Sequence, residues 1–314
     1  MTVNCDDLQR MARPHILHSM TMQKNEGRQV AFIGTGVMGA PMAGHLIEAG
    51  YSLRIHTRTK EKAKPLIERG AEWADTPIEA IPNADFVCTM VGMPSDLNSV
   101  YFDNGGIFAH VKKGAVLVDF TTSDPGLAQE IARQAESYGI ASLDAPVTGG
   151  QRGALEARLS ILVGGTPSVF DKAQGLLKHL GTPRLMGPSG SGQYAKLSNQ
   201  VAIAGVMLGV CEALSFAIRS GLDPYKVLEG ISGGAAASWT LQNLAPKMLA
   251  ADFAPGFYVK HFIKDLKLAH TVATQLKLNF PCLSLALKSY EDLAAIGGSE
   301  FGTQALIKLY EPQS

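Results

Sequence analysis

A glycine-rich turn, Gly34-Thr35-Gly36-Val37-Met38-Gly39, directly follows the short apolar run Val30 to Ile33. The spacing G-x-G-x-x-G between a strand and a helix is typical of the first turn of a dinucleotide-binding βαβ unit. Its first glycine would permit the tight turn, its second would let the backbone approach a pyrophosphate, and its third would let the helix pack closely on the strand. The unpaired N–H groups at the helix start would then face the phosphates. The turn therefore predicts a nicotinamide-dinucleotide site, with an ordinary tight turn as the alternative.

Short β-rich runs alternate with helical stretches from Gln29 to about Met186. The pattern predicts strands at residues 30–33, 52–56, 85–91, 115–119, 141–144 and 159–163, and helices at 37–49, 59–69 and 124–138. The strand at 85–91 is almost continuously apolar, as expected when both faces of a sheet are covered. Strands separated by helices predict parallel βαβ units, and hence an α/β, Rossmann-type doubly wound parallel sheet over residues 29–189.

The character of the chain changes after the glycine- and serine-rich segment at residues 187–192. Residues 193 to about 220 are compatible with one helix that is apolar on most sides, and Gly221-Leu222-Asp223-Pro224 would end it and start another. No β-rich run follows, so residues 190–314 are predicted to form an all-helical domain for substrate binding and dimerisation. A helix apolar nearly all round must be covered. We therefore expect it to be largely buried, and the chain to form a homodimer or homotetramer.

Composition and charge limit the class of partner. Lys plus Arg (28) balance Asp plus Glu (28), so no net charge attracts nucleic acid or an anionic membrane, and a small molecule is the expected partner. The four cysteines form no ligand-spaced cluster, so neither a metal site nor a disulfide framework is expected. Residues 1–28 are polar and mixed, and they lack the apolar core of a signal peptide. We expect them to form a flexible N-terminal extension of a cytoplasmic protein.

The end of the second predicted strand bears on the choice of cofactor. An NAD site usually carries an acid there, which accepts from the ribose 2′-hydroxyl. This chain instead reads His56-Thr57-Arg58-Thr59-Lys60, without an acid. Arg58 could stack on the adenine or bind a 2′-phosphate bidentately, and Thr59 adds a hydroxyl. The segment predicts a preference for NADP, with NAD still possible; the alternative is a solvated basic helix start.

Three further segments complete a family pattern. They are Asp144-Ala145-Pro146-Val147-Thr148-Gly149-Gly150 after a strand, the run from Gly190 to Gln200 that opens the long helix, and Ile263-Lys264-Asp265-Leu266-Lys267-Leu268-Ala269 in a later helix. With the glycine turn, they resemble the β-hydroxyacid dehydrogenases, the family that includes 3-hydroxyisobutyrate dehydrogenase and semialdehyde reductases. The resemblance spans residues 29 to about 310. It implies a Rossmann-type domain followed by an all-helical one, with an active site between them that interconverts a small semialdehyde acid and its hydroxy acid.

The resemblance also implies roles for individual residues. Lys196 would be the catalytic lysine, acting as general acid in reduction and as general base in oxidation. Lys264 would reach the cofactor, and Asp265 would orient the lysines. Contacts to the substrate, including its carboxylate, are implied for Thr148, Gly149, Gly150, Asn199 and Gln200. The dinucleotide would be lined by the glycine turn and by residues that follow two further strands, Met90, Val91, Gly92, Thr121 and Thr122.

Elementary chemistry supports the role of Lys196. Hydride transfer to a carbonyl leaves an alkoxide, which needs a proton donor and a hydrogen-bond partner. A lysine at a helix start, near the nicotinamide and another ammonium, can have its pKa lowered toward neutrality. Asn199 and Gln200, three and four positions further, share its helical face. The alternative is an ordinary lysine on the surface of a helix.

The chain departs from the family pattern at two positions. Many members carry Asn-Asn where this chain has Asn199-Gln200, which leaves open which amide contacts the substrate. Thr148 stands where serine is usual, and its hydroxyl can make the same hydrogen bond. Two other functions compete with a hydroxyacid dehydrogenase. One is an imine reductase of the same fold, a class that generally lacks the lysine at position 196. The other is a non-catalytic dinucleotide-binding scaffold, against which Lys196 and Asp265 argue.

Overall fold

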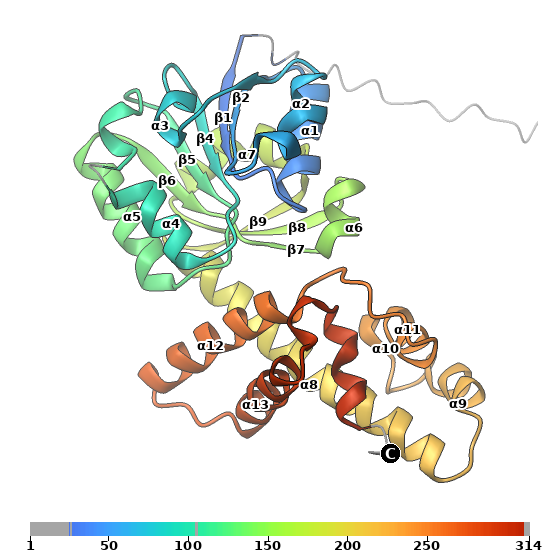
Figure 1. Ribbon diagram of the computed structural model, residues 1–314. Coiled ribbons are helices and arrows are strands. Elements are labelled where there is room, and N and C mark those ends of the chain that lie inside the picture. Colours follow the sequence, from blue (N-terminus) through green and yellow to red (C-terminus); the bar gives the residue numbers. More distant parts are fainter. Residues whose placement is uncertain (1–24, 26, 104–105, 311–314) are drawn as a thin grey trace, which may run out of the picture.

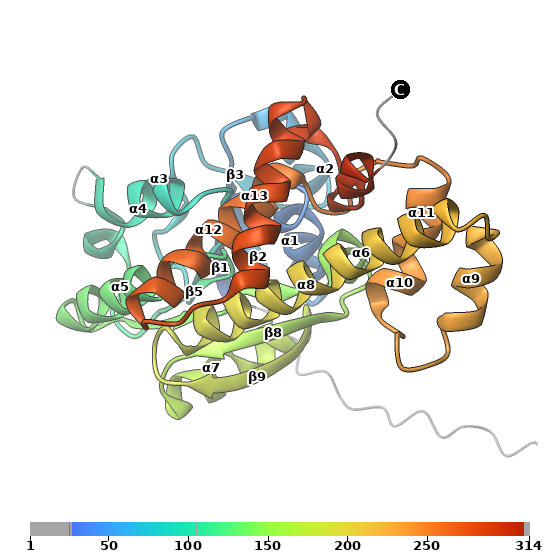
Figure 2. The same ribbon diagram turned by 90° about the horizontal axis from the view of Figure 1, so that it is seen from below.

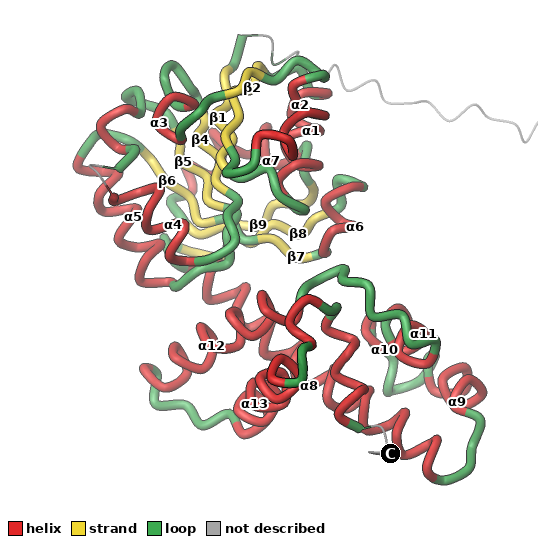
Figure 3. Tube along the Cα trace, viewed as in Figure 1, coloured by secondary structure: helices red, strands yellow, loops and turns green. Residues whose placement is uncertain are grey.

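Figure 1 shows the computed structural model, which describes residues 25, 27–103 and 106–310. The predicted extension at residues 1–28 lies outside the described residues, except for Asn25, Gly27 and Arg28, and stays a prediction. An α/β part and a helical part lie one above the other in this view, and the long helix α8 (Ser191–Arg219) runs from the first into the second. In Figure 3 the strands, drawn yellow, lie in the upper part.

One mainly parallel sheet forms the α/β part. Its strands are β1 (Gln29–Ile33), β2 (Ser52–His56), β3 (Glu72–Trp73), β4 (Phe86–Thr89), β5 (Val116–Asp119), β6 (Ala141–Asp144), β7 (Val147–Thr148), β8 (Leu159–Gly164) and β9 (Gly181–Gly187). They lie in the order β3-β2-β1-β4-β5-β6-β8-β7, with β9 beside β8. Neighbours from β3 to β6 are parallel, as predicted. In contrast, β8 is antiparallel to β6 and β7 and parallel to β9. Residues 149–158 alone join β7 to β8, which is too short for the crossover that a parallel pair needs.

Alternation along the strands explains how the sheet is covered on both faces. In β1, Val30 and Phe32 belong to one core, whereas Ala31 and Ile33 belong to another, because successive side chains of a strand point to opposite faces. The first core also takes residues of α1 (Gly39–Glu48) and α7 (Pro167–Lys178), and the second those of α4 (Pro94–Phe102) and α5 (Pro125–Ser137). Helices on both faces of a mainly parallel sheet make this the Rossmann-type fold expected from the sequence.

The charged helix predicted at residues 59–69 is broken in two. A 3-10 turn at Lys60–Ala63 is followed by a single helical turn, α2 (Lys64–Ile67), with Pro65 at its start. Proline has no N–H to donate and its ring clashes with the preceding turn, so a continuous helix cannot pass through it. The sequence pattern also did not single out α3 (Pro77–Ala80), α4, α6 (Gly150–Leu155), α7, β3, β7 and β9.

Every named element after residue 190 in the described part of the chain is helical, as predicted. After α8 come α9 (Pro224–Ile231), α10 (Trp239–Asn243), α11 (Ala245–Leu249), α12 (Val259–Gln275) and α13 (Pro281–Ala295), and then 3-10 turns at Gly298–Glu300 and Thr303–Leu309. Figure 2 shows α12 and α13 beside α8, with α9, α10 and α11 gathered near its far end. These helices share one apolar core, which includes Leu208, Phe262, Leu266 and Tyr290. The core is separate from the two that cover the sheet.

Helix α8 is covered on one face and bare on the other. By length and composition alone it could cross a membrane, with a mean hydropathy of 2.1 over an 18-residue window, but a single helix of this kind is weak evidence for a span. Because 39% of that window is buried, the prediction of a largely buried helix is wrong for the single chain. Ala202, Val206, Gly209 and Phe216 are exposed along one face of the helix, Val206 by 37% and Phe216 by 76%. Ile218, 49% exposed, lies on the opposite side of the last turn. An apolar face of α8 is thus left uncovered by this chain.

Candidate active site

The loops that follow β1, β4 and β5 leave the sheet at the edge that faces the helical part (Figure 1). Ligands of doubly wound sheets bind at this edge, outside the carboxyl ends of the strands. Helix α8 begins here, and α12 approaches the loop after β4. A Cβ built on Gly92 in that loop would lie 3.8 Å from Cε1 of His261 in α12. Both parts of the chain therefore contribute side chains to this junction.

The glycine turn between β1 and α1 has the geometry that a bound pyrophosphate needs. Gly34 has a φ of +99°, and a Cβ there would lie 2.2 Å from the carbonyl oxygen of Met90. A Cβ on Gly39 would lie 1.9 Å from the carbonyl oxygen of Gly34, whereas one on Gly36 would meet no described atom within 4 Å. Packing therefore requires the first and third glycines, and the second borders open space.

The start of α1 adds a positive electrostatic field, which attracts an anion, beside that open space. Met38 precedes the helix and makes no side-chain capping bond to any described residue, and the first turn, Gly39 to Met42, contains uncharged residues alone. Thr35 is buried, whereas Val37 is 50% exposed. Uncapped N–H groups at a helix start favour an anion. Residues 34–39 therefore fit the pyrophosphate of a dinucleotide.

The buried carboxylate of Asp119 fixes the two loops beside the glycine turn. Thr89 Oγ1 donates to Asp119 Oδ1 at 2.7 Å, and the backbone N–H of Thr121 donates to the same oxygen at 3.0 Å. Thr121 Oγ1 in turn accepts from the backbone N–H of Val91 at 3.1 Å. Burial raises the pKa of Asp119 to about 7 against the opposing effect of its hydrogen bonds, with a smaller contribution from Asp144. These bonds hold the residues after β4 and β5 at fixed positions.

Asp144, at the end of β6, ties the sheet to the start of α8. Its Oδ1 accepts from the backbone N–H of Gly190 at 2.7 Å, and its Oδ2 from that of Gln193 at 2.9 Å. Burial raises the pKa of Asp144 to about 6, although these hydrogen bonds lower it. A Cβ on Gly192 would lie 2.4 Å from the carbonyl oxygen of Leu162 in β8. The first turn of α8 is therefore held directly against the sheet.

Gln193 ties the same helix to the loop after β5. Its side chain is fully buried; Oε1 accepts from the backbone N–H of Ser123 at 2.9 Å, and Nε2 donates to the carbonyl oxygen of Thr121 at 2.8 Å. Sequence reasoning did not single out Asp144 or Gln193 as functional residues. The partners of Gln193, which are Asp144, Ser123 and Thr121, lie 49, 70 and 72 positions away in the chain. No local pattern reveals such contacts.

Lys196 lies in α8, one turn past Gln193, and 7% of it is exposed. Burial lowers the pKa of Lys196 to about 8; the carboxylate of Asp265 opposes this effect and the ammonium of Lys264 adds to it. A group with this pKa can give up or take a proton near neutral pH. Among the residues singled out from the sequence, Lys196 has the surroundings best suited to acid–base chemistry.

Lys264 and Asp265 bring α12 to the same place. Lys264 Nζ donates to the carbonyl oxygen of Thr122 at 2.7 Å and lies 3.0 Å from Asp265 Oδ1. No described residue makes a well-aligned hydrogen bond to that oxygen, so the attraction between the two side chains is chiefly one of charge. Lys264 thus joins the helical part to the loop after β5, beside Lys196.

Asn199 and Gln200 form a chain of amides that ends on Asp265. Gln200 Nε2 donates to Asp265 Oδ2 at 2.5 Å, and Asn199 Nδ2 donates to Gln200 Oε1 at 2.8 Å. Gln200 is 2% exposed, whereas Asn199 is half-buried. The structure therefore brings together the residues expected at the chemical end of the site, namely Lys196, Asn199, Gln200, Lys264, Asp265 and Thr122.

The segment expected to hold a carboxylate has an unusual backbone. Thr148 ends β7, where it pairs with Ser160 of β8, and is half-buried. Gly149 and Gly150 follow with φ values of +129° and +61°, which favour glycine, and both are exposed. A Cβ on Gly150 would lie 4.0 Å from the carbonyl oxygen of Gly256. This segment therefore faces the helical part, with its backbone accessible.

Arg58 and Thr59 lie at the end of β2, apart from the contacts described so far. Arg58 is 83% exposed in its side chain, and its Nη1 donates to Asp96 Oδ1 of α4 at 3.3 Å. Thr59 is exposed and precedes the 3-10 turn at Lys60–Ala63. An exposed ion pair of this kind is worth about 0–1 kcal/mol. The guanidinium is therefore free to exchange Asp96 for an anionic ligand.

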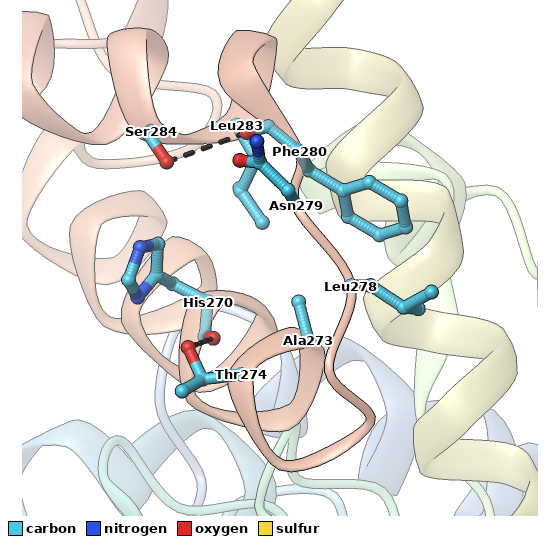
Figure 4. Close-up of a pocket in the computed structure, with 8 residues that line it drawn as sticks. All are labelled: His270, Ala273, Thr274, Leu278, Asn279, Phe280, Leu283 and Ser284. Atoms are coloured by element: carbon cyan, nitrogen blue, oxygen red, sulfur yellow. Dashed lines mark hydrogen bonds between the residues drawn. The ribbon is translucent and has the colours of Figure 1, made fainter.

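Other parts of the described chain offer less chemistry. A hollow of about 160 Å³ lies between α12 and α13 (Figure 4), lined by His270, Ala273, Thr274, Leu278, Asn279, Phe280, Leu283 and Ser284. Its two hydroxyls bond to the backbone of their own helices, Thr274 to His270 and Ser284 to Phe280. No motif residue lines it. Within residues 25, 27–103 and 106–310, no group of three or more His, Cys, Asp or Glu is placed to hold a metal ion.

Comparison with known proteins matches both parts of the chain. The family model of the NAD binding domain of 6-phosphogluconate dehydrogenase covers residues 29–192, and that of the NAD-binding domain of NADP-dependent 3-hydroxyisobutyrate dehydrogenase covers residues 190–310. An uncharacterised oxidoreductase of Bacillus subtilis is 47% identical, over 90% of this chain and 99% of the relative. A probable mitochondrial 3-hydroxyisobutyrate dehydrogenase-like protein of Arabidopsis thaliana is 45% identical, over 90% and 85%. The 2-hydroxy-3-oxopropionate reductase of Escherichia coli is 36% identical, over 90% and 97%.

Solved structures give the same picture. The 3-hydroxyisobutyrate dehydrogenase of Mycobacterium tuberculosis, solved with L-serine, superposes with a TM-score of 0.84 at 29% identity, over 91% of this chain and 99% of that one. An imine reductase of Streptomyces aurantiacus superposes with a TM-score of 0.60 at 22% identity, over 91% and 100%. At that identity the second likeness concerns the fold alone.

Proposed function

Because the chain belongs to the β-hydroxyacid dehydrogenase family and is an NAD(P)-dependent oxidoreductase, we propose that it interconverts a small semialdehyde acid and its hydroxy acid, with NADP preferred. The observation that carries the proposal is Lys196, a buried lysine with a pKa of about 8 at the junction of the two parts. The bound nicotinamide would supply or accept the hydride. The residues of the chain bind, orient and move a proton.

Lys196 would hold the proton that the substrate oxygen gains or loses. In reduction the Nζ ammonium would donate to the oxygen of the new hydroxyl, and in oxidation the neutral amine would take that proton back. The ammonium of Lys264, held by Thr122 and Asp265, adds positive charge beside the developing alkoxide. The carboxylate of Asp265 balances the two lysines, so that burial does not drive the pKa of Lys196 lower still.

Thr148, Gly149 and Gly150 would hold the substrate carboxylate. The hydroxyl of Thr148 and the accessible N–H groups of the two glycines can all donate to an anion. The glycines support this role because their positive φ values turn the backbone in a way that other residues adopt with strain. A panel of short aldehyde acids, followed by the loss of NADPH absorbance, tests the proposal. Turnover of none of them would contradict it.

The pH dependence should follow the pKa of Lys196. In oxidation the neutral amine is needed, so log kcat/KM should rise by about one unit per pH unit up to about 8 and then level off. In reduction the ammonium is needed, so the rate should be constant below about 8 and fall above it. Asp265→Asn removes the charge that raises the pKa of Lys196 and should move both limbs to lower pH. Limbs that stay in place in this variant would contradict the assignment.

Arg58 supports the preference for NADP, since it is exposed at the end of β2 and weakly held by Asp96. We expect Arg58→Ala to lower kcat/KM for NADPH by about 10- to 100-fold, the loss typical of one or two charge-assisted hydrogen bonds, with little effect on NADH. Kinetics with both cofactors measure this. Lys62→Ala, on the exposed turn nearby, is the matched control. A wild-type preference for NADH, or equal losses with both cofactors, would contradict the assignment.

Two alternatives predict different results. An imine reductase would reduce cyclic imines and leave aldehyde acids untouched, so the same absorbance assay with both classes separates it from a semialdehyde reductase. A dinucleotide-binding scaffold would bind NADPH without turning over either class. Lys196, with its buried position and lowered pKa, favours the hydroxyacid dehydrogenase.

The bare face of α8 supports self-association as a homodimer or homotetramer. Exposed apolar side chains gather there, Phe216 among them at 76% exposure, and such a face is covered in a stable protein. Light scattering should therefore give a molar mass at least twice that of the chain, and Phe216→Asp should lower it. Leu155→Asp, at a 57% exposed position on α6, is the control. A monomeric wild type would contradict this proposal.

A further inference from the structure

The direction of the hydrogen bonds between Asn199, Gln200 and Asp265 is set by chemistry. A carboxylate accepts hydrogen bonds and, when ionised, donates none. Gln200 must therefore present its NH2 group to Asp265 Oδ2, at 2.5 Å, and its Oε1 must point back toward Asn199. Asn199 must then present its own NH2 group to that oxygen, at 2.8 Å. The charge on Asp265 thus fixes the orientation of both amides.

This chain of amides ends in a carbonyl oxygen. Asn199 Oδ1 lies at the opposite side of the amide from the bonded nitrogen, and no residue that the structure describes donates to it. Gln200, in contrast, has both ends of its amide occupied and is 2% exposed. Asn199 is half-buried and stands three residues after Lys196, on the same face of α8. The amide left for a substrate is therefore that of Asn199, and its free atom is an acceptor.

The other polar groups expected at the substrate act mainly as donors, the hydroxyl of Thr148 included, although a hydroxyl can also accept. Lys196 and Lys264 carry ammonium groups, and the backbone of Gly149 and Gly150 offers N–H groups. Such groups suit a carboxylate and the reacting oxygen. An acceptor at Asn199 instead suits a substrate group that donates a hydrogen bond. Because Asn199 is one turn from the lysine that exchanges the proton, that group should sit beside the reacting carbon.

We propose that Asn199 Oδ1 determines substrate specificity, and that it favours three-carbon acids whose α-carbon carries a hydroxyl or an ammonium group. An α-methyl group or an α-hydrogen would leave the oxygen without a donor from the substrate, and that loss lowers kcat/KM by about 10- to 100-fold. Gln200 is a positioning residue, which acts through Asn199 and Asp265. The proposal rests on the hydroxyacid dehydrogenase function proposed above.

The experiment measures oxidation of four stable hydroxy acids with NADP by the full chain. Glycerate and serine carry a donor on the α-carbon, 3-hydroxyisobutyrate carries a methyl group, and 3-hydroxypropionate carries hydrogen alone. We expect wild-type kcat/KM for the better donor-bearing acid to exceed that for 3-hydroxypropionate by about 10-fold or more. Asn199→Leu, which keeps the approximate shape without the carbonyl, should bring this ratio close to one. Ser198→Ala, at the exposed neighbouring position, should keep the wild-type ratio.

A ratio of two substrates in one enzyme cancels losses common to both, so it separates a contact with the substrate from a structural role. Gln200→Met removes both amide bonds without touching Asn199 itself, and it should lower the ratio as well; it also serves if Asn199→Leu does not fold. An unchanged ratio in both variants, or a wild type without the preference, would overturn the proposal. If wild type oxidises none of the four acids and reduces no aldehyde acid, the proposed function fails first, and this inference with it.

Discussion

Replacing Lys196 with alanine is expected to lower kcat by about 1000-fold or more, while the Kd for NADPH changes by less than about threefold. General acid–base catalysis by one side chain contributes about 100- to 10,000-fold, and Lys196 is a buried lysine whose pKa is lowered to about 8. The glycine turn at residues 34–39, where we propose that the cofactor binds, lies between β1 and α1 and not in α8, so binding should survive. Single-turnover kinetics and a fluorescence titration with NADPH measure the two quantities.

Two further variants show whether a loss of activity reflects proton transfer by Lys196 or its charge. Lys196→Arg keeps the positive charge, but its guanidinium does not release a proton in the accessible pH range, so it should be nearly as inactive as the alanine variant. Lys267→Ala, on the exposed face of α12 with a 59% exposed side chain, should behave as wild type. If Lys196→Arg retained activity, charge rather than proton transfer would be the contribution of Lys196, and the proposed mechanism would be wrong.

Substitutions at Gly36 and Gly39 should affect cofactor affinity and stability differently. A Cβ on Gly36 meets no described atom within 4 Å, so Gly36→Ala should leave Tm within about 2 °C of wild type. Its methyl group would occupy the space that a pyrophosphate needs, so the Kd for NADPH should rise by about 10-fold or more. In Gly39→Ala the added Cβ would lie 1.9 Å from the carbonyl oxygen of Gly34. We expect that variant to lose about 1–3 kcal/mol of stability as well as cofactor affinity.

Thermal unfolding and NADPH titration of both variants check this pair of outcomes. Gly175→Ala in α7 is the control, since its Cβ also meets no described atom within 4 Å but lies away from the turn. It should leave cofactor affinity unchanged. A Gly36→Ala variant with wild-type affinity would mean that the phosphates do not approach this residue.

Strands that are buried on both faces could be predicted from the sequence, because nearly all their residues are apolar. The runs at β1, β4 and β5 are apolar on both faces, and each is found where expected. The two-residue strands β3 and β7 carry too few residues for any pattern. The reversal of β8 depends on how little chain joins it to β7. Pro65 does mark the break between the 3-10 turn and α2, but the charged pattern on either side of it favours a single helix.

The candidate site shows a similar division. Lys196, Lys264 and Asp265 stand in motifs, and a motif can be recognised without knowing what it touches. The hydrogen bonds made by Asp119, Asp144 and Gln193 could not be predicted from the sequence, because each joins segments that are distant in the chain. Whether Asn199 or Gln200 faces the substrate could not be decided from sequence either. The answer depends on which of them reaches Asp265, a residue 65 positions beyond Gln200.

The side chains of α8 and α12 that hold the loop after β5 bond to its backbone atoms. Gln193 holds the carbonyl oxygen of Thr121 and the N–H of Ser123, and Lys264 holds the carbonyl oxygen of Thr122. Every residue type supplies a carbonyl oxygen, so side chains in this loop can be exchanged without breaking its link to the helices. Divergence among descendants of such a chain should therefore be greater at the half-buried Thr122 than at the buried Thr121 and Ser123, while Gln193 and Lys264 persist. The cofactor contacts proposed for this loop could then change by mutation at Thr122 while the α/β part and the helical part stay joined.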